Sequence, residues 1–393
     1  IGGNVMAMDS GEGEELRYPL AITFWTNARA GEVRALLGND TGRLRLPENP
    51  NEAIEHERTV YVAGKRSELE RFAASPLVSS ITFIAPKHIS NVNSRALSNA
   101  DAIIAGPYNL DGTGVAVGEW DGGSVQDDHP DLIGRVTNYD AVADDNHATH
   151  VAGTIMGNGT GNPAARGYAT AATLHAYDFN GDLFGERRTL RNAVYTEHNN
   201  HSWSEDVAVF GFYNATDTEF DTDSRYNLDL AIKSASNDGL DSEVTHGGNL
   251  FDSIPQSSTG KNNLIIGATT DAGVLTDFSS RGPTNDGRIK PDVATNGHGL
   301  TSTLPGSTYG SMSGTSMSAP STTGVVTLLA QLYKAQHGNR RWAPDVVRTV
   351  MIHTCSDPFN PGPDYHHGWG NIDAQAAADL ILADAASSSK RIV

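Results

Sequence analysis

Cysteine is nearly absent from this chain of 393 residues, in which Cys355 is the only one. A single cysteine excludes a disulfide within the chain, so the fold has to be stabilised by core packing, with or without bound ions. The segment around it, Thr354-Cys355-Ser356-Asp357, carries no recognisable motif of a cysteine nucleophile. The sequence therefore does not predict cysteine-based catalysis.

Long apolar runs and basic residues are also scarce. No stretch approaches the roughly 20 apolar residues that a membrane-spanning helix needs, and 28 Lys and Arg stand against 47 Asp and Glu, a formal net charge of −19. An acidic chain repels the phosphates of nucleic acids, so we expect neither nucleic acid nor a membrane as a partner. The sequence begins at Ile1 rather than Met, as a processed or trimmed chain does, so the lack of a signal peptide here says nothing about secretion. We expect a secreted location, extracellular or periplasmic.

The length suggests two domains, with a boundary near residue 95. Residues 1–95 predict a small ferredoxin-like α+β domain in which strands and helices alternate. We expect strands over residues 17–26, 59–63 and 78–85, a helix from a cap at Asn27 to Leu37 with Gly38 as its stop, and a helix from a capping box at Ser67–Glu70 to Ala74.

Residues 96–393 predict a larger α/β domain. After a polar connector over residues 86–112, short apolar strands alternate with helices, which indicates a doubly wound, mostly parallel sheet with helices on both faces. We expect strands over residues 114–120, 172–176, 264–267 and 292–294, and helices over residues 148–155 and 317–336.

Asp121 stands at the end of the first of these strands and is followed by Gly122 and Gly123. Functional groups of a doubly wound sheet gather at the carboxyl ends of its strands, where a carboxylate can accept a hydrogen bond from an imidazole. Strand-Asp-Gly is also an ordinary turn, so Asp121 alone indicates little. The glycines do not form the G-x-G-x-x-G motif of dinucleotide binding.

Two histidines, His147 and His150, lie three residues apart on an expected helix. Zinc proteases place two histidines four residues apart with a glutamate between them, and that pattern is missing here. His147 is at the helix start, where it can face a cleft and act as a base. His150 lies beside Val151 and Ala152, which favours a buried, hydrogen-bonded structural role.

Ser316 is expected in the first turn of a long apolar helix, within Gly314-Thr315-Ser316-Met317-Ser318-Ala319-Pro320. Free N–H groups and the positive end of the helix dipole stabilise negative charge at such a place. Pro320 is compatible with this turn because the first turn needs no donor to an earlier carbonyl. A serine at a helix start is usually a cap. What distinguishes Ser316 is that the Asp121 and His147 segments occur in the same chain.

Asn237 lies in Ser234-Ala235-Ser236-Asn237-Asp238-Gly239, after an apolar turn at residues 230–232. Its side-chain amide is suited to be one donor of an oxyanion hole. Asn-Asp-Gly is also a common turn, and the residues alone leave both interpretations open.

Together these segments resemble the signature segments of the subtilase family of serine proteases. The order Asp, His, Ser along the chain is that of subtilisins, and the resemblance covers about residues 111–378. The matching segments are Asp121 with His129-Pro130-Asp131-Leu132, residues 147–153, residues 314–320, residues 236–239, and Phe278–Pro283 with Lys290-Pro291-Asp292.

The resemblance implies a serine endopeptidase on a seven-stranded parallel sheet, which acts on proteins or peptides without a catalytic cofactor. Asp121, His147 and Ser316 would form the catalytic triad, and Asn237 with the backbone N–H of Ser316 would form the oxyanion hole. A peptide ligase or transpeptidase would use the same residues and the same acyl-enzyme. A non-catalytic scaffold on this fold would usually have lost a triad member.

The resemblance also places substrate-binding segments at Ser202-Trp203-Ser204 and Ser234-Ala235-Ser236. Ser204, Ser236 and Ala148 stand where the family usually has glycine, and Gly122 where it usually has Thr or Ser. All four are small residues, so none is expected to block the site. Ser204 leaves open the shape of the pocket and thus the residue preferred before the scissile bond.

The N-terminal domain resembles an inhibitory subtilase propeptide, most clearly over residues 59–86. This implies a zymogen in which the N-terminal domain binds the catalytic domain as an intramolecular inhibitor and residues 86–99 enter the cleft. A retained accessory domain is the alternative.

A structural calcium ion is expected from Asp178-Phe179-Asn180-Gly181-Asp182, which spaces the oxygen ligands of Asp178, Asn180 and Asp182 at alternate positions. Calcium loops use this spacing. The segment lacks the glutamate at position twelve, and a polar turn is the alternative.

Overall fold

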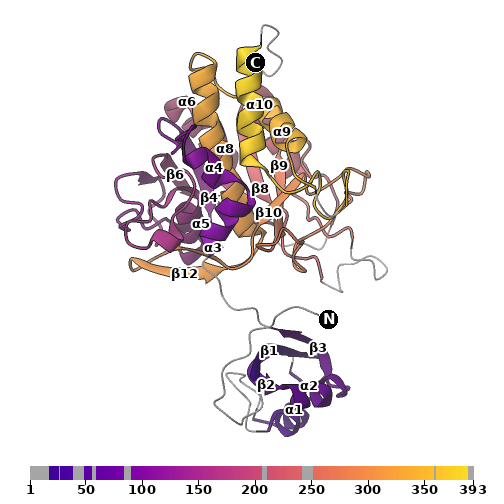
Figure 1. Ribbon diagram of the computed structural model, residues 1–393. Coiled ribbons are helices and arrows are strands. Elements are labelled where there is room, and N and C mark those ends of the chain that lie inside the picture. Colours follow the sequence, from indigo (N-terminus) through magenta and orange to yellow (C-terminus); the bar gives the residue numbers. More distant parts are fainter. Residues whose placement is uncertain are drawn as a thin grey trace. The chain divides into compact units, whose positions relative to one another are not determined.

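The computed structural model describes residues 17–25, 27–38, 48–54, 59–83, 90–205, 210–240, 251–357 and 360–387. It divides into two compact units, residues 1–88 and residues 89–393 (Figure 1). Each unit is described by itself. In the described residues no helix is both long enough and apolar enough to span a bilayer.

The first unit is a three-stranded antiparallel sheet with two helices. Its elements are β1 (Arg17–Phe24), α1 (Ala30–Leu37), β2 (Thr59–Lys65), α2 (Arg66–Ala73) and β3 (Val78–Phe83), in the sheet order β2-β1-β3. The three strands and the two helices match three of the four strands and both helices of the predicted ferredoxin-like fold. The fourth strand of that fold is not among the described residues. Ile22, Phe24, Val33 and Phe72 are in its core.

Both helices of this unit begin at other residues than the sequence predicted. The cap of α1 is Arg29 rather than Asn27, and the backbone N–H of Arg29 donates to the Glu32 carboxylate at 3.2 Å. The cap of α2 is Lys65, whose N–H donates to Glu68 at 2.8 Å. In each case a glutamate three residues into the helix decides the start.

The connector predicted over residues 86–112 contains two helices instead, α3 (Ser90–Leu97) and α4 (Ala100–Ile104). Their polar side chains are used inside the second unit: the Ser94 hydroxyl lies 2.6 Å from the Tyr168 hydroxyl. Ile103 packs in the main core. The polar composition therefore reflects buried hydrogen bonds rather than a loop.

The second unit is built on a seven-stranded sheet whose strand pairs are parallel, as predicted. Its order is β10-β9-β8-β7-β4-β6-β5. The strands are β4 (Ala116–Asp121), β5 (Val136–Asn138), β6 (Thr173–Asp178), β7 (His198–His201), β8 (Leu230–Ser234), β9 (Leu264–Thr269) and β10 (Val293–Asn296). The residues 230–232 that the sequence suggested as a turn belong to β8.

Helices cover both faces of this sheet (Figure 1). The remaining elements are α5 (Asn146–Met156), a short 3₁₀ helix (Pro163–Ala165), α6 (Leu183–Val194), α7 (Ala215–Tyr226), β11 (Leu300–Leu304), β12 (Thr308–Met312), α8 (Thr315–Gln336), α9 (Pro344–His353) and α10 (Ala374–Ala386). The apolar residues of α8 pack on β8, β9 and β10, and those of α5 on β4 and β6. On the opposite face, α6 packs against Trp120 and Tyr177.

Candidate active site

The carboxyl ends of β4, β7 and β8 meet at one edge of the sheet. From β4 the chain adds β5 and β6 on one side, and β7 to β10 on the other, so β4 and β7 flank the point where the strand order reverses. Ligands of open α/β sheets bind at this point. Asp121 ends β4, and residues 202–204 and 235–237 follow β7 and β8.

Asp121 and His147 are joined by a hydrogen bond. The Nδ1–H of His147 donates to Oδ1 of Asp121 at 2.7 Å, and the same oxygen accepts from the backbone N–H of Gly122 at 2.7 Å. Asp121 is 2% exposed, whereas the side chain of His147 is 34% exposed. A buried carboxylate thus fixes the tautomer of an imidazole whose other nitrogen can meet a reacting group.

Asp145 fixes the backbone beneath this imidazole. Its carboxylate caps α5 by accepting from the N–H groups of His147 at 2.8 Å and Ala148 at 2.9 Å. Asp121, Asp145 and His147 each bring one atom to within 4.8 Å of the others. The cap and the hydrogen bond to Nδ1 account for this cluster as an oriented base, without a metal.

Two effects compete on the pKa of His147. Burial acts to lower it, but the charge of Asp121, the hydrogen bond to Asp121 and the charge of Asp145 together raise it above the ordinary value. The charges around His147 therefore stabilise its imidazolium form.

His150 has a structural role, as the sequence indicated. It is fully buried, and its Nε2 donates to the carbonyl of Leu300 at 2.9 Å. Burial lowers its pKa to about 4. His150 is thus a neutral tie between α5 and β11.

Ser316 lies in the first turn of α8 and exchanges two hydrogen bonds with Ser202. The Ser316 hydroxyl donates to the Ser202 carbonyl, and the Ser202 hydroxyl donates to the Ser316 carbonyl, both at 2.9 Å. Ala148 and Met317, which follow His147 and Ser316, belong to one hydrophobic cluster. The starts of α5 and α8 are therefore packed together.

The second of these bonds corrects the expectation for Pro320. This proline lies inside α8, beyond its first turn, and its missing N–H would have bonded to the carbonyl of Ser316. The Ser202 hydroxyl satisfies that carbonyl instead. Pro320 is tolerated because the Ser316 carbonyl accepts a hydrogen bond from Ser202, directly after β7, in place of the missing helix hydrogen bond.

Asn237 is positioned by the start of α8. Its Oδ1 accepts from the backbone N–H of Thr315 at 2.9 Å and from the Thr315 hydroxyl at 3.1 Å. With the oxygen engaged, the amide nitrogen is the atom left to face a ligand, and it lies beside Gly314. Its neighbour in the chain, Ser236, has φ +80°.

The substrate-binding segments predicted from the sequence lie side by side, since β7 and β8 are neighbours. The Ser204 and Ser236 hydroxyls are 3.2 Å apart. Ser234 donates to the Trp203 carbonyl at 3.4 Å. Ala235 is buried in a small apolar cluster, so it supports the segment from below.

Lys233 was missed by sequence reasoning. It is fully buried, its Nζ donates to the Trp203 carbonyl, and the ammonium lies 3.6 Å from the centre of the Trp203 ring. Burial lowers the pKa of Lys233 to about 7, although Asp217 and Glu205 act in the opposite direction. A lysine within an apolar strand is the only signal that could have indicated it.

Glu119 was also missed. It lies in β4 two residues before Asp121, hence on the same face, and it is fully buried with no hydrogen-bond partner for either carboxylate oxygen among the described residues. Burial and then the charges of Asp121 and Asp145 raise its pKa well above the ordinary value. The protonated form of Glu119 is therefore favoured over its carboxylate form.

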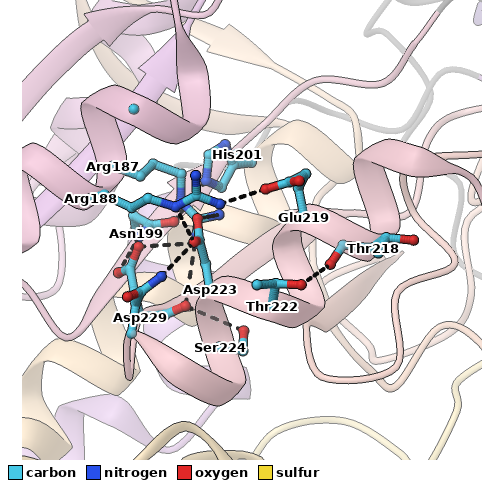
Figure 2. A network of polar contacts seen from close by, with 12 residues as sticks. Arg187, Arg188, Asn199, His201, Thr218, Glu219, Thr222, Asp223, Ser224 and Asp229 are labelled. Atoms are coloured by element: carbon cyan, nitrogen blue, oxygen red, sulfur yellow. Dashed lines mark hydrogen bonds and ion pairs between the residues drawn. The ribbon is translucent and has the colours of Figure 1, made fainter.

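A network of ion pairs occupies the opposite face of the sheet (Figure 2). We call Arg187, Arg188, Asp223 and Asp229 the Arg187 network. Arg187 is fully buried between Asp223 at 3.2 Å and Asp229 at 3.0 Å, and Arg188 reaches Asp223 at 2.8 Å. Asp229 also accepts from Asn199 of β7 at 2.6 Å. The network thus holds α6, α7 and β7 together.

The residues predicted to bind calcium take part in local hydrogen bonds. Asp178 accepts from the backbone N–H of Asn180 at 3.0 Å and from its side chain at 2.7 Å, and Asp182 caps α6 by accepting from Gly185 at 3.3 Å. These contacts are those of a polar turn. Calcium binding by Asp178, Asn180 and Asp182 stays a prediction.

Several known proteins resemble this chain. The subtilase family model matches residues 112–370. Subtilisin BL of Lederbergia lenta is 29% identical over 290 residues, which cover 72% of this chain and 97% of that protein. The serine protease AprX of Bacillus subtilis is 26% identical over 71% of this chain and 69% of its own length. C5a peptidase of Streptococcus pyogenes is 31% identical over 127 residues, and the match spans only 11% of its length.

Solved structures agree on the fold. The CspB protease of Clostridium perfringens has a TM-score of 0.66 at 15% identity and covers 74% of this chain and 99% of its own. The patellamide maturation protease PatA has a TM-score of 0.55 at 23% identity and covers 69% of this chain and 98% of its own. The sheet order, the motif order and the family match over most of the second unit agree, and the chain belongs to the subtilase family.

Proposed function

We propose that this protein is a serine endopeptidase in which Asp121, His147 and Ser316 form the catalytic triad. The observation that carries the proposal is the 2.7 Å bond from Nδ1 of His147 to buried Asp121, at the start of a helix that packs against the start of α8, where Ser316 lies. His147 takes the hydroxyl proton of Ser316 while Oγ attacks the peptide carbonyl. The protonated imidazole then protonates the leaving amine, and water hydrolyses the acyl-enzyme.

The serine has to turn before it reacts, because its hydroxyl donates to the Ser202 carbonyl in this structure. A rotation about the Cα–Cβ bond exchanges this acceptor for Nε2 of His147. Hydrogen bonds of a catalytic site are often formed fully only with substrate bound. In this proposal, the Ser202 carbonyl is the hydrogen-bond acceptor of the Ser316 hydroxyl in the substrate-free enzyme.

In this proposal, the side chain of Asn237 and the backbone N–H of Ser316 stabilise the negative charge on the tetrahedral intermediate. The bond from Thr315 to Oδ1 orients Asn237 so that its amide nitrogen is available. The N–H of Ser316 belongs to the first turn of a 22-residue helix, where the dipole favours an anion. Asn237→Ala should keep substrate binding and lower turnover about 10²–10³-fold.

The test is labelling with a fluorophosphonate and location of the modified residue by mass spectrometry. We expect the label on Ser316, no label in Ser316→Ala or with heat-unfolded protein, and loss of casein cleavage in Ser316→Ala. Ser318→Ala is the matched control, since Ser318 is a buried serine one half-turn further along α8. Casein cleavage that survives Ser316→Ala would reject the proposal.

A peptide ligase or transpeptidase remains the second candidate because its acyl-enzyme would form on the same residues. The two differ only in whether water or an amine resolves the acyl-enzyme. Product analysis with an added amine nucleophile distinguishes them: an endopeptidase gives mainly the free acid. A non-catalytic scaffold is disfavoured because every triad residue is present.

We further propose that the N-terminal unit is an inhibitory propeptide of a secreted zymogen. Its support is that residues 1–88 form a compact unit of ferredoxin-like order outside the family match. Mass spectrometry of freshly purified protein over time should show cleavage after this unit, together with rising activity. An uncleaved chain that is fully active from the start would reject this part alone.

A further inference from the structure

Two serine hydroxyls connect the segments that follow β7 and β8. Oγ of Ser236 lies 2.6 Å from Asp238 Oδ2 and 3.2 Å from Oγ of Ser204. Because the Ser236 proton is given to Asp238, Ser204 is the donor in the second contact. The pair forms a direct bridge between the two segments.

This bridge lies next to the proposed nucleophile and oxyanion donor. Ser202, two residues before Ser204, accepts from the Ser316 hydroxyl, and Asn237 directly follows Ser236. A carbonyl placed between Ser316 and Asn237 therefore belongs to a residue that lies against both segments. The side chain of that residue must therefore occupy the space beside the contact between Ser204 and Ser236.

Further contacts hold the two segments together below the bridge. The Trp203 carbonyl accepts from Lys233 and, at 3.4 Å, from the Ser234 hydroxyl. The ammonium of Lys233 also lies against the Trp203 ring, 3.6 Å from its centre. Because these donors are buried or nearly so, the spacing of the segments is fixed rather than adjustable.

The backbone of Ser236 shows that the bridge has a cost. Its φ of +80° lies in the left-handed region, where glycine is favoured and other residues are strained. The hydroxyl bonds to Asp238 and Ser204 offset this strain. A strained serine retained beside a reactive site indicates that its side chain serves the site.

We propose that the Ser204–Ser236 bridge narrows the space for the residue before the scissile bond, so that Gly, Ala and Ser are accepted there and large side chains are rejected. This inference rests on the proposed endopeptidase function and names its substrate class. Ser204 and Ser236 are specificity-determining residues, and the ties from Lys233 and Ser234 to Trp203 keep the space narrow.

The test uses tetrapeptide p-nitroanilides that differ only in the last residue: Ala, Ser, Leu or Phe. We expect kcat/KM of the wild type to be at least about tenfold higher for Ala than for Phe, which is the order of magnitude by which a fixed pocket discriminates side-chain size. Ser204→Gly with Ser236→Gly should raise the ratio of kcat/KM for Phe to kcat/KM for Ala about tenfold. Ser204→Ala is the matched control, because it removes the hydroxyl bond and keeps the Cβ.

A second readout does not depend on cleavage. Ser236→Gly, made in the Ser316→Ala background, should not lower the melting temperature, because glycine adopts this φ without strain. A wild type that is labelled at Ser316 and cleaves Phe as fast as Ala overturns the inference alone, as does an unchanged preference in the double variant. Absence of labelling at Ser316 overturns the proposed function and this inference with it.

Discussion

Buried charge is treated in two different ways on the two faces of the sheet. In the Arg187 network each buried aspartate meets a guanidinium at 3.2 Å or less (Figure 2). At the carboxyl end of β4, Glu119 and Asp121 are equally deep, and the group bonded to Asp121 that can become a cation is the imidazole of His147. The first region balances its charges permanently, whereas the second balances them with protons.

The difference separates a structural from a functional arrangement. Buried carboxylates without a fixed counter-ion are costly, so most of them become paired or protonated. Groups whose pKa is displaced by burial and by a neighbouring charge gather at reactive sites. The region around β4 therefore keeps its charge balance adjustable, and variants of each region should affect different properties.

The largest effect is expected from Asp121→Asn, which acts on the adjustable region. Asparagine keeps the shape but presents an amide to Nδ1 of His147, so the imidazole takes the wrong tautomer, and kcat should fall by about 10⁴. The melting temperature should not fall, since the change removes one charge from an acid-rich place. A variant with more than a tenth of wild-type kcat would contradict the assignment of Asp121.

Arg187→Met tests the permanently balanced region. It removes the ion pair of buried Asp229 to Arg187 and leaves buried Asp223 with Arg188 alone, and the free energy of unfolding should drop by about 3–5 kcal/mol. Arg188→Met is the matched control: its side chain is 40% exposed, so we expect at most about 1 kcal/mol. Urea unfolding in the Ser316→Ala background measures both without autolysis. Equal losses in the two variants would remove the distinction.

The sequence singled out the residues of the proposed triad more clearly than the elements that hold them. Asp121, His147 and Ser316 were singled out by motifs of small and polar residues at strand and helix ends. The strand β7 was missed because its four residues, HNNH, are polar and nevertheless buried. Its buried side chains form hydrogen bonds to residues distant in the sequence, as Asn199 does to Asp229. Such pairing leaves no local periodicity in the sequence.

Glu119 and Lys233 show a second limit of the sequence. Each is a charged residue within an otherwise apolar strand, and each is fully buried. A pattern of apolar and polar residues assigns such side chains to the surface. What buries them is the tertiary surroundings, which supply a carbonyl and an aromatic ring for Lys233 and a proton for Glu119.

A smaller effect, dependent on pH, is expected from Glu119→Gln. The folded-state pKa of Glu119 lies well above the ordinary value because of burial and of Asp121 and Asp145. The folded state thus keeps a proton that the unfolded chain loses above about pH 4.3. Its stability is full below that pH and declines by up to about 1.4 kcal/mol per pH unit as pH rises toward the folded-state pKa.

Because glutamine has no proton to lose, Glu119→Gln should match the parent near pH 4 and be more stable at pH 8. Urea unfolding of both proteins at pH 4, 6 and 8, each in the Ser316→Ala background, gives the difference. The other titrating groups are common to both proteins and cancel. A stability difference that stays the same at all three values would show that Glu119 is ionised in the fold.

The smallest effect is expected from Asp145→Asn, which probes how the adjustable region sets the base. Asparagine is an equally good helix cap, so α5 should stay intact while one negative charge beside His147 is lost. The charge of Asp145 contributes to the raised pKa of His147. Its removal should lower that pKa and move the acid limb of kcat/KM to lower pH, because His147 has to be neutral to accept a proton.

Asp144→Asn is the matched control. It is an identical change one residue earlier, at an exposed side chain that is not among the charges that raise the pKa of His147. If both variants moved the limb equally, the shift would reflect net charge alone, and the nearby charge of Asp145 would not set the pKa of His147.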